Sequence, residues 1–141
     1  MKKKYYLLVF AFIFIKSNLL YSQTNCSTAL PITINGACQS GSVNDNSADL
    51  PALTGCTATF NRERWYTFTV VGGSQTITIT GTSTSTNRNL YLQLISLTGT
   101  CASGTLTQIA CANAINTNSA QTETITITLT NGVYFIKVLN V

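Results

Sequence analysis

Carboxylates and cysteines are the residues of this chain that could do chemistry beyond hydrogen bonding. The sequence has 4 acidic residues and 5 cysteines but no histidine, so Ser-His and Cys-His nucleophile pairs and His-containing zinc sites are unavailable. A zinc site made of cysteines alone is disfavoured because no C-x-x-C spacing occurs. A glycosidase would need two carboxyl groups roughly 5 to 9.5 Å apart, and nothing in the sequence brings Glu63 and Glu123 together. These residue types therefore predict a protein that is not an enzyme.

Residues 1–22 have the layout of a secretory signal. Lysines at positions 2–4 precede an apolar run over residues 5–15, and the segment ends on the small residue Ser22. The apolar run is too short to cross a bilayer as a helix. We expect residues 1–22 to be a signal peptide and the mature protein to begin near Gln23. The mature protein is then secreted or displayed at the cell surface, with no membrane span left after the signal is removed.

Removal of the signal changes the charge of the chain. The full sequence has a formal net charge of +4, from 8 Lys+Arg and 4 Asp+Glu. The lysines at positions 2, 3, 4 and 16 leave with the signal, so the mature chain has a net charge of zero. Nucleic-acid binding needs clustered Lys and Arg to displace counterions, and it is therefore excluded as a main role. A neutral surface of Thr, Ser, Asn and Gln favours recognition by hydrogen bonds instead.

The cysteines are predicted to form disulfides, because an exported chain folds in an oxidising environment. Cys101 and Cys111 are predicted to pair, since they bracket the turn region at Gly104 and could close a loop between neighbouring strands. One further pair is expected among the remaining cysteines, which are Cys26, Cys38 and Cys56. The sequence does not choose between the three possible pairings, and one thiol is left free or paired outside the chain.

The oxygen-rich cluster of the sequence lies at residues 44–49, where Asp45 and Asp49 supply carboxylates. Carboxylate and carbonyl oxygens are the ligands that Ca²⁺ prefers. The spacing does not match an EF-hand loop, however, and Asn and Asp are ordinary turn residues. A turn is the favoured interpretation, with Asp45 and Asp49 as the candidate calcium ligands, and no other cofactor is predicted.

Hydrophobic periodicity after the signal has a period of two. Apolar residues occupy every second position in runs over 76–80, 90–95 and 124–130, which predicts strands with one buried face each. Glycines separate the runs, and Asn131-Gly132 predicts a tight hairpin turn between the last two strands. Residues 23–141 are therefore predicted to form a single all-β domain, an antiparallel sandwich of jelly-roll or immunoglobulin-like type.

Residues 63–70 form the most distinctive predicted strand. Trp65 lies on the opposite side of this strand from Tyr66 and Phe68, so the three rings cannot form one platform for stacking on sugars. Core packing is predicted instead, with Tyr66 and Phe68 directed inward. Glu63 is expected to form a surface ion pair, which contributes roughly 0 to 1 kcal/mol. Its candidate partners are Arg62, Arg64 and Arg88.

The same strand resembles the D-x-W-Y-x-F core strand of bacterial pre-peptidase C-terminal (PPC-like) domains. Further landmarks of that family occur in order along the chain: Cys26 with Ala29, Pro31 and Ile32; Gly36 with Cys38; Cys56; Ile77-Thr78-Ile79; Leu90-Tyr91-Leu92; Cys101; Ile109-Ala110-Cys111-Ala112; and a closing run over residues 132–138. The resemblance covers nearly all of the mature chain. It rests on the ordered set of landmarks and not on one motif.

The resemblance implies a β-sandwich accessory module of secreted or cell-surface bacterial proteins, with no active site of its own. The expected role is support of adhesion, substrate targeting or presentation, with carbohydrate or an extracellular protein surface as the partner. Two alternatives stay open: a fragment of a larger secreted peptidase or glycoside hydrolase, and a structural surface protein without a specific ligand. Similar proteins exported through a type IX-like route have a C-terminal sorting domain, which leads us to expect a truncated member or a lone domain here.

Two positions depart from the family pattern. Glu63 stands where the family usually has Asp, two positions before the Trp, and it is a substitute with a longer reach. The family's Phe-Asp pair before the Leu-Tyr-Leu strand is replaced by residues 86–89, whose sequence is Thr-Asn-Arg-Asn. Calcium binding is known among some relatives, and the loss of this carboxylate argues against such a site.

Overall fold

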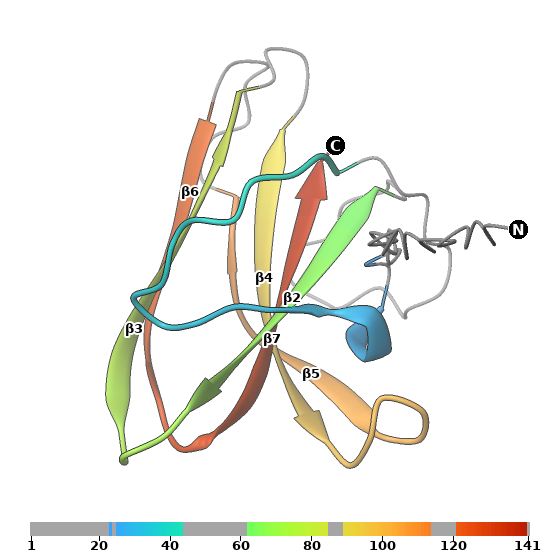
Figure 1. Ribbon diagram of the computed structural model, residues 1–141, viewed down its shortest axis with the longest axis vertical. Coiled ribbons are helices and arrows are strands. Elements are labelled where there is room, and N and C mark those ends of the chain that lie inside the picture. The colour runs from blue at the N-terminus through green and yellow to red at the C-terminus, as the bar shows by residue number, and fades with distance from the viewer. Residues whose placement is uncertain (1–22, 24, 44–61, 85–88, 114–120, 141) are drawn as a thin grey trace, which may run out of the picture.

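Strands make up most of the described chain. The computed structural model describes residues 23, 25–43, 62–84, 89–113 and 121–140. Within these ranges the elements are η1 (Cys26–Thr28), β1 (Leu30–Pro31), β2 (Glu63–Val70), β3 (Gln75–Ser83), β4 (Leu90–Thr98), β5 (Thr105–Ala112), β6 (Gln121–Leu129) and β7 (Gly132–Asn140). They form two sheets that face each other (Figure 1). The predicted all-β sandwich is confirmed.

The two sheets differ in size. The larger has five strands in the order β1-β2-β7-β4-β5, and the smaller pairs β3 with β6. Every pairing is antiparallel except that of β1 with β2, which is parallel. In Figure 1, β3 and β6 lie together on the left, and β4, β7 and β2 run beside one another to the right. Because β7 pairs with both β2 and β4, the last strand of the chain is the centre of the larger sheet.

The smaller sheet follows the alternation of its sequence. On β3 and β6 the isoleucines at 77 and 125 are buried, whereas their threonine neighbours are exposed. Threonine suits this outer face because its branched side chain favours the extended backbone while its hydroxyl stays hydrated. The sheet thus has one apolar face, and this face must pack against a second layer.

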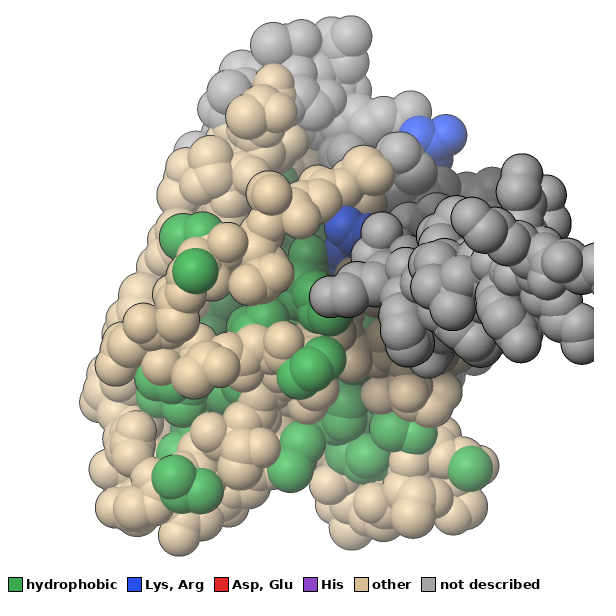
Figure 2. Space-filling model, in the orientation of Figure 1, with side chains coloured by type: hydrophobic (Ala, Val, Ile, Leu, Met, Phe, Trp, Pro, Cys, Tyr) green, Lys and Arg blue, Asp and Glu red, His purple; other side chains and the backbone are tan. Residues whose placement is uncertain are grey.

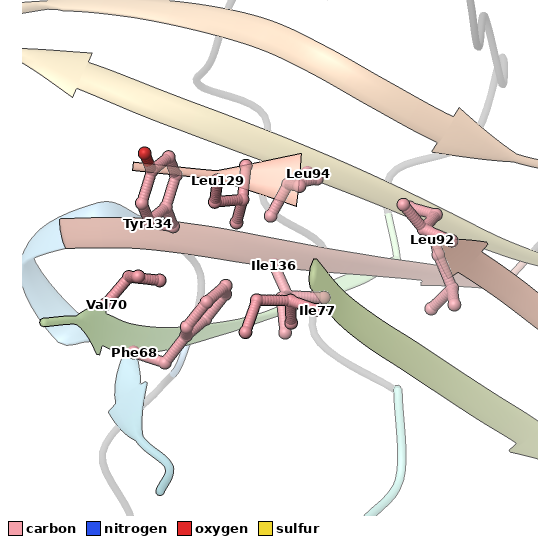
Figure 3. Packing of buried hydrophobic residues seen from close by; sticks show 9 residues of the cluster. Phe68, Val70, Ile77, Leu92, Leu94, Leu129, Tyr134 and Ile136 are labelled. Atoms are coloured by element: carbon pink, nitrogen blue, oxygen red, sulfur yellow. The ribbon is translucent and has the colours of Figure 1, made fainter. Parts of the chain in front are cut away.

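The main core fills the space between the sheets. Its buried members are Phe68, Val70, Ile77, Leu92, Leu94, Ile125, Leu129, Tyr134 and Ile136. Figure 3 shows eight labelled side chains of this set gathered between the strands, with the Phe68 and Tyr134 rings stacked at a centroid distance of 5.7 Å. Gly81 lets the sheets approach, since a Cβ there would lie 2.9 Å from Cδ2 of Leu92. Tyr66 and Phe68 face this core, as predicted.

A second core lies on the opposite face of the larger sheet. Trp65 and Ile95 have no exposed surface (0% each), and they pack with Phe135 and Cys26. Cys26 comes from η1, so the N-terminal segment covers part of this face. The expectation of one buried face per strand is therefore wrong for β4, where residues 90–95 are all buried. The sequence periodicity of β4 correctly predicts a strand, but it does not show that another segment covers the outer face of that strand.

The connection at Asn131-Gly132 is not a hairpin. β6 pairs with β3, whereas β7 pairs with β2 and β4, so the chain crosses from one sheet to the other at this point. The link between β2 and β3 crosses beside it, and the two links are joined because the Gly73 amide donates a hydrogen bond to Oδ1 of Asn131 (2.7 Å). Gly72 and Gly73 have φ values of +86° and +101°, which favour glycine.

Several predicted features lie outside the described residues. The signal peptide (1–22), the oxygen-rich cluster with Asp45 and Asp49, and Cys56 belong to this group. In the part of the chain that the structure describes, no helix is long and apolar enough to cross a membrane.

Candidate functional site

Glu63, Trp65 and Lys137 form a buried polar cluster on the larger sheet. Glu63 and Trp65 are two positions apart on β2, so both point to the outer face of the larger sheet. Lys137 lies on β7 directly opposite Trp65. The indole Nε1 donates a hydrogen bond to Oε1 of Glu63 (2.9 Å), and Nζ of Lys137 forms an ion pair with Oε2 of the same carboxylate. Nζ also lies 5.6 Å from the centroid of the Trp65 ring.

Burial gives this cluster an architectural role. The side chains of Lys137 and Glu63 are only 10% and 5% exposed. The prediction of a surface ion pair for Glu63 is therefore wrong, because its carboxylate is held inside the second core and pairs with a lysine of the neighbouring strand. Charges buried in this way must be paired and hydrogen-bonded to be tolerated. The cluster fixes the Trp65 ring and ties β2 to β7, and it offers no open face to a substrate.

The structure does not bring the two glutamates together. Glu63 points away from the space between the sheets, together with Trp65. Glu123 is 1% exposed and shares the inward side of β6 with Ile125, opposite Gly81 of β3. The larger sheet therefore separates the two side chains, and this pair cannot act as the two carboxyl groups of a glycosidase.

The predicted Cys101–Cys111 disulfide is wrong. Cys101 is bonded to Cys26, with a Cα–Cα distance of 5.7 Å and a sequence separation of 75. Cys101 lies in the turn before β5, whereas Cys111 lies six positions after the first residue of that strand. At about 3.3 Å per residue, Cys111 lies roughly 20 Å along β5 from Thr105, towards the end of the strand away from the turn that holds Cys101, whereas bridged Cα atoms are usually within about 7 Å of each other.

The remaining described cysteines divide into one bonded residue and one free residue. Cys111 is also disulfide-bonded, and Cys38 is a free, exposed thiol. The Cys26–Cys101 bond anchors η1 to the hairpin between β4 and β5, and it holds the N-terminal segment on the outer face of the larger sheet. The sequence could not show this, because the two residues meet only after the chain has folded back over β2.

The outer face of the smaller sheet presents only threonine. The register pairs Thr76 with Thr128, Thr78 with Thr126, Thr80 with Thr124 and Thr82 with Thr122, and all eight side chains are exposed. We call these eight residues the threonine face. In three of the pairs the Oγ1 atoms lie 3.2 to 3.3 Å apart and hydrogen-bond across the strands. None of the described charged side chains lies on this face, since they belong to β2, to the residue before it, to β7 and to the inward side of β6.

Figure 2 agrees with a surface of low charge. In this view the described surface is mainly uncharged polar side chains and backbone, with apolar side chains between them and blue only beside the grey residues. The described residues contain no group of three or more His, Cys, Asp or Glu placed to hold a metal ion.

The fold and these contacts define a β-sandwich module in which the ionisable pair Glu63–Lys137 supports the architecture. The family model of the bacterial pre-peptidase C-terminal domain matches residues 62–139, and the chain belongs to this family. The match runs from the residue before β2 into β7. This domain is a non-catalytic accessory domain that occurs in secreted bacterial proteins. Neither the comparison with curated proteins nor the comparison with solved structures found a match.

Lys137 is the member of this cluster that the sequence analysis did not identify. It is a single charge within the apolar run of β7, where a buried lysine needs a carboxylate on a neighbouring strand. Glu63 lies on the predicted strand over residues 63–70 and Glu123 directly precedes the predicted run over residues 124–130, so the set of partners was already small. This pattern was visible in the sequence, but identifying Glu63 as the partner of Lys137 requires knowing that β2 and β7 are neighbours.

Proposed function

We propose that this chain works outside the bacterial cell as a non-catalytic accessory module that attaches a secreted or surface-bound protein to an uncharged polysaccharide. The observation that carries the proposal is the threonine face, on which every outward position of β3 from 76 to 82 and of β6 from 122 to 128 is threonine. Membership of the pre-peptidase C-terminal family supports the accessory role, because domains of this family accompany secreted bacterial proteins.

The chemistry of the face suits a neutral, hydroxyl-rich partner. Paired threonines across antiparallel strands have Cβ atoms about 4.5 to 5.5 Å apart, and successive pairs follow at about 6.5 Å along the strands. The face thus offers a regular lattice of hydroxyl groups that can both donate and accept hydrogen bonds. It has no described charge that would attract an ionic ligand. A neutral polymer with repeating hydroxyl groups matches this surface better than an acidic or basic partner does.

The test is retention of the mature protein on insoluble polysaccharides. A variant in which Thr76, Thr78, Thr126 and Thr128 are replaced by valine removes four hydroxyls and keeps the β-branched shape. At about 0.5 to 1.5 kcal/mol for each lost hydrogen bond, we expect at least a tenfold loss of retention. The matched control is Thr105→Val, at an exposed position on β5 of the other sheet, which should bind as the parent protein does.

Three outcomes would decide against the proposal. Equal retention of the parent and the four-valine variant would mean that the threonine face is not the contact surface. Retention on extracellular-matrix protein and not on polysaccharide would assign a protein partner. If the parent protein binds none of these surfaces, it is a structural spacer.

A further inference from the structure

The smaller sheet leaves its two outer edges open. In the described chain β3 and β6 pair only with each other, from Gln75–Leu129 to Ser83–Gln121 without a register shift. In an antiparallel pair every second residue directs its N–H and C=O groups away from the partner strand. Among the described residues, no backbone hydrogen bond from another segment reaches these groups on either strand. Each edge of this sheet can therefore accept a further strand.

The edges of the larger sheet are protected. β1, at one end of it, has only 2 residues and ends on Pro31, which has no N–H group to donate. β5, at the other end, has a register shift at Ile109 that interrupts its ladder with β4. Short strands, proline and bulges are features by which proteins prevent edge-to-edge pairing. β6 has neither a proline nor a bulge, and its one charge, Glu123, is 1% exposed and lies near the start of the strand.

Of the two open edges, that of β6 is the more accessible. β6 lies over β4 and β5, whereas β3 lies over β4. Ile32 and Ile34, in the segment after β1, pack against the main core, to which Ile77 of β3 belongs. In Figure 1 this segment runs across the molecule to β3. A segment of the described chain thus flanks β3, and none of the described segments flanks the outer edge of β6.

We propose that two copies of this chain pair along β6, antiparallel and across a twofold axis, so that their smaller sheets join into one sheet. A second copy fits because the alternation of β6 is self-complementary. With Ile125 on the axis, the two Ile125 residues lie opposite each other, and Thr124 lies opposite the partner's Thr126. Isoleucines then meet isoleucines on the inner face and threonines meet threonines on the outer face, as they do between β3 and β6.

Charge does not oppose this pairing. Residues 124–129 carry no charge, and Glu123 lies opposite the partner's Ile127 in the same register. Like charges directly opposite one another destabilise a pair of strands, whereas threonine pairs stabilise it. A partner of another kind would need the same alternation over the same length, which β6 itself supplies in every copy. Because one strand edge is a narrow contact, the dimer should dissociate on dilution.

Pairing along β6 also extends the threonine face. The outward threonines of β6 in the two copies become neighbours, so the faces of two copies form one surface. A polymer bound there is held by both copies, which raises the avidity without a new kind of contact. The inference goes beyond the proposed function and does not depend on it. Association is measured without polysaccharide, so a dimer that is not retained on polysaccharide would leave the inference standing.

The test measures the mass of the exported, oxidised protein in solution over a range of concentrations. A Cys38→Ser background excludes a dimer formed through the free thiol. Sedimentation equilibrium should give a mass that rises with concentration from that of one chain to that of two. Thr126→Lys places a positive charge from each copy beside the twofold axis, and it should raise the dimer dissociation constant at least about tenfold.

Thr78→Lys is the matched control. Thr78 is the exposed cross-strand partner of Thr126, and both substitutions remove the same hydrogen bond between the two Oγ1 atoms (3.3 Å). Because Thr78 lies on β3, its variant should dimerise as the parent protein does. Loss of the dimer in both lysine variants would assign the contact to the threonine face, and loss in Thr78→Lys alone would assign it to β3. Either result would overturn the proposal.

Amide hydrogen exchange of the protein without a lysine substitution gives a second readout. Amides of residues 122–128 should exchange more slowly as the protein concentration rises, and those of residues 76–82 should not. This measurement decides the question even if Thr126→Lys fails to fold. A protein that stays monomeric, a dimer that persists in folded Thr126→Lys, or exchange in β6 that does not change with concentration would each contradict pairing along β6.

Discussion

Replacement of Lys137 by methionine tests the buried ion pair most directly. Methionine keeps an unbranched apolar chain in the second core but leaves the Glu63 carboxylate without its cationic partner. Because the two side chains are only 10% and 5% exposed, solvent cannot replace the lost contact at little cost. Removal of one member of a buried pair typically costs about 3 to 5 kcal/mol. We expect Lys137→Met to lower the free energy of unfolding at pH 7 by about 3 kcal/mol.

A second substitution separates the cost of the orphaned charge from the value of the pair. Glu63→Gln removes the charge but keeps a carbonyl oxygen that can accept the hydrogen bond from the Trp65 indole. The double variant has neither charge, so it should be more stable than Lys137→Met alone. We expect the double-mutant cycle formed by these variants to give a coupling free energy of about 2 kcal/mol between the two side chains, since replacement of both members of a buried pair is often close to neutral.

Trp65 provides the assay, because the chain has 1 Trp and its side chain is fully buried beside the pair. Urea denaturation of the oxidised protein, followed by tryptophan fluorescence, gives the free energy of each variant. Arg62→Met is the control: it removes a nearby positive charge that forms no ion pair with a described residue, and it should change stability by less than about 0.5 kcal/mol. A loss below about 1 kcal/mol for Lys137→Met would refute the reasoning, since it would place the pair in the range of solvent-exposed salt bridges.

Two further predictions concern the hairpin between β4 and β5. Cys101→Ser opens a cross-link with a sequence separation of 75 and should cost about 4 kcal/mol on the loop-entropy model, whereas Cys38→Ser, which changes a free exposed thiol, should leave the urea midpoint unchanged. Equal midpoints for both variants would mean that the N-terminal segment is held by packing alone. Gly104→Ala places a Cβ 2.5 Å from the carbonyl oxygens of Thr98 and Thr100 and should cost about 2 kcal/mol, while Ser103→Ala in the same turn should cost much less. A tolerated alanine at position 104 would show that the turn can open without loss of the fold.

The strands of the smaller sheet could be predicted from the sequence because a single alternation of apolar and polar residues determines which side chains are buried and which are exposed. Ile77 and Ile125 are apolar and buried, and the threonines between such positions are exposed, so the period of two gives both strand and orientation. On β4 the same period identified the strand but not the burial of Tyr91 and Gln93 on its outer side. That burial depends on segments that are distant in sequence, and local patterning contains no information about them.

The incorrect predictions of strand, cysteine and ion pairing also arise because local sequence does not reveal contacts between distant segments. Asn131-Gly132 has the composition of a hairpin turn, and the chain does bend at Asn131, but the strands on either side belong to different sheets. Turn chemistry describes the local backbone, whereas the choice of partner depends on which strands bury the most apolar surface together. The Cys26–Cys101 disulfide and the Glu63–Lys137 ion pair both follow from the arrangement of strands, so both were out of reach until that arrangement was known.

The threonine face shows why the function was harder to predict than the fold. Threonine is favoured at exposed strand positions for its shape alone, so eight threonines on one face are explained equally by β-propensity and by a need for hydroxyl groups. Valine has nearly the same shape and the same preference for extended backbone, but it has no hydroxyl. In the four-valine variant the two explanations diverge: β-propensity predicts an intact, fully functional sheet, and recognition predicts an intact sheet that no longer binds. The unfolding midpoint of that variant, measured beside its retention on polysaccharide, therefore separates a role in folding from a role in binding.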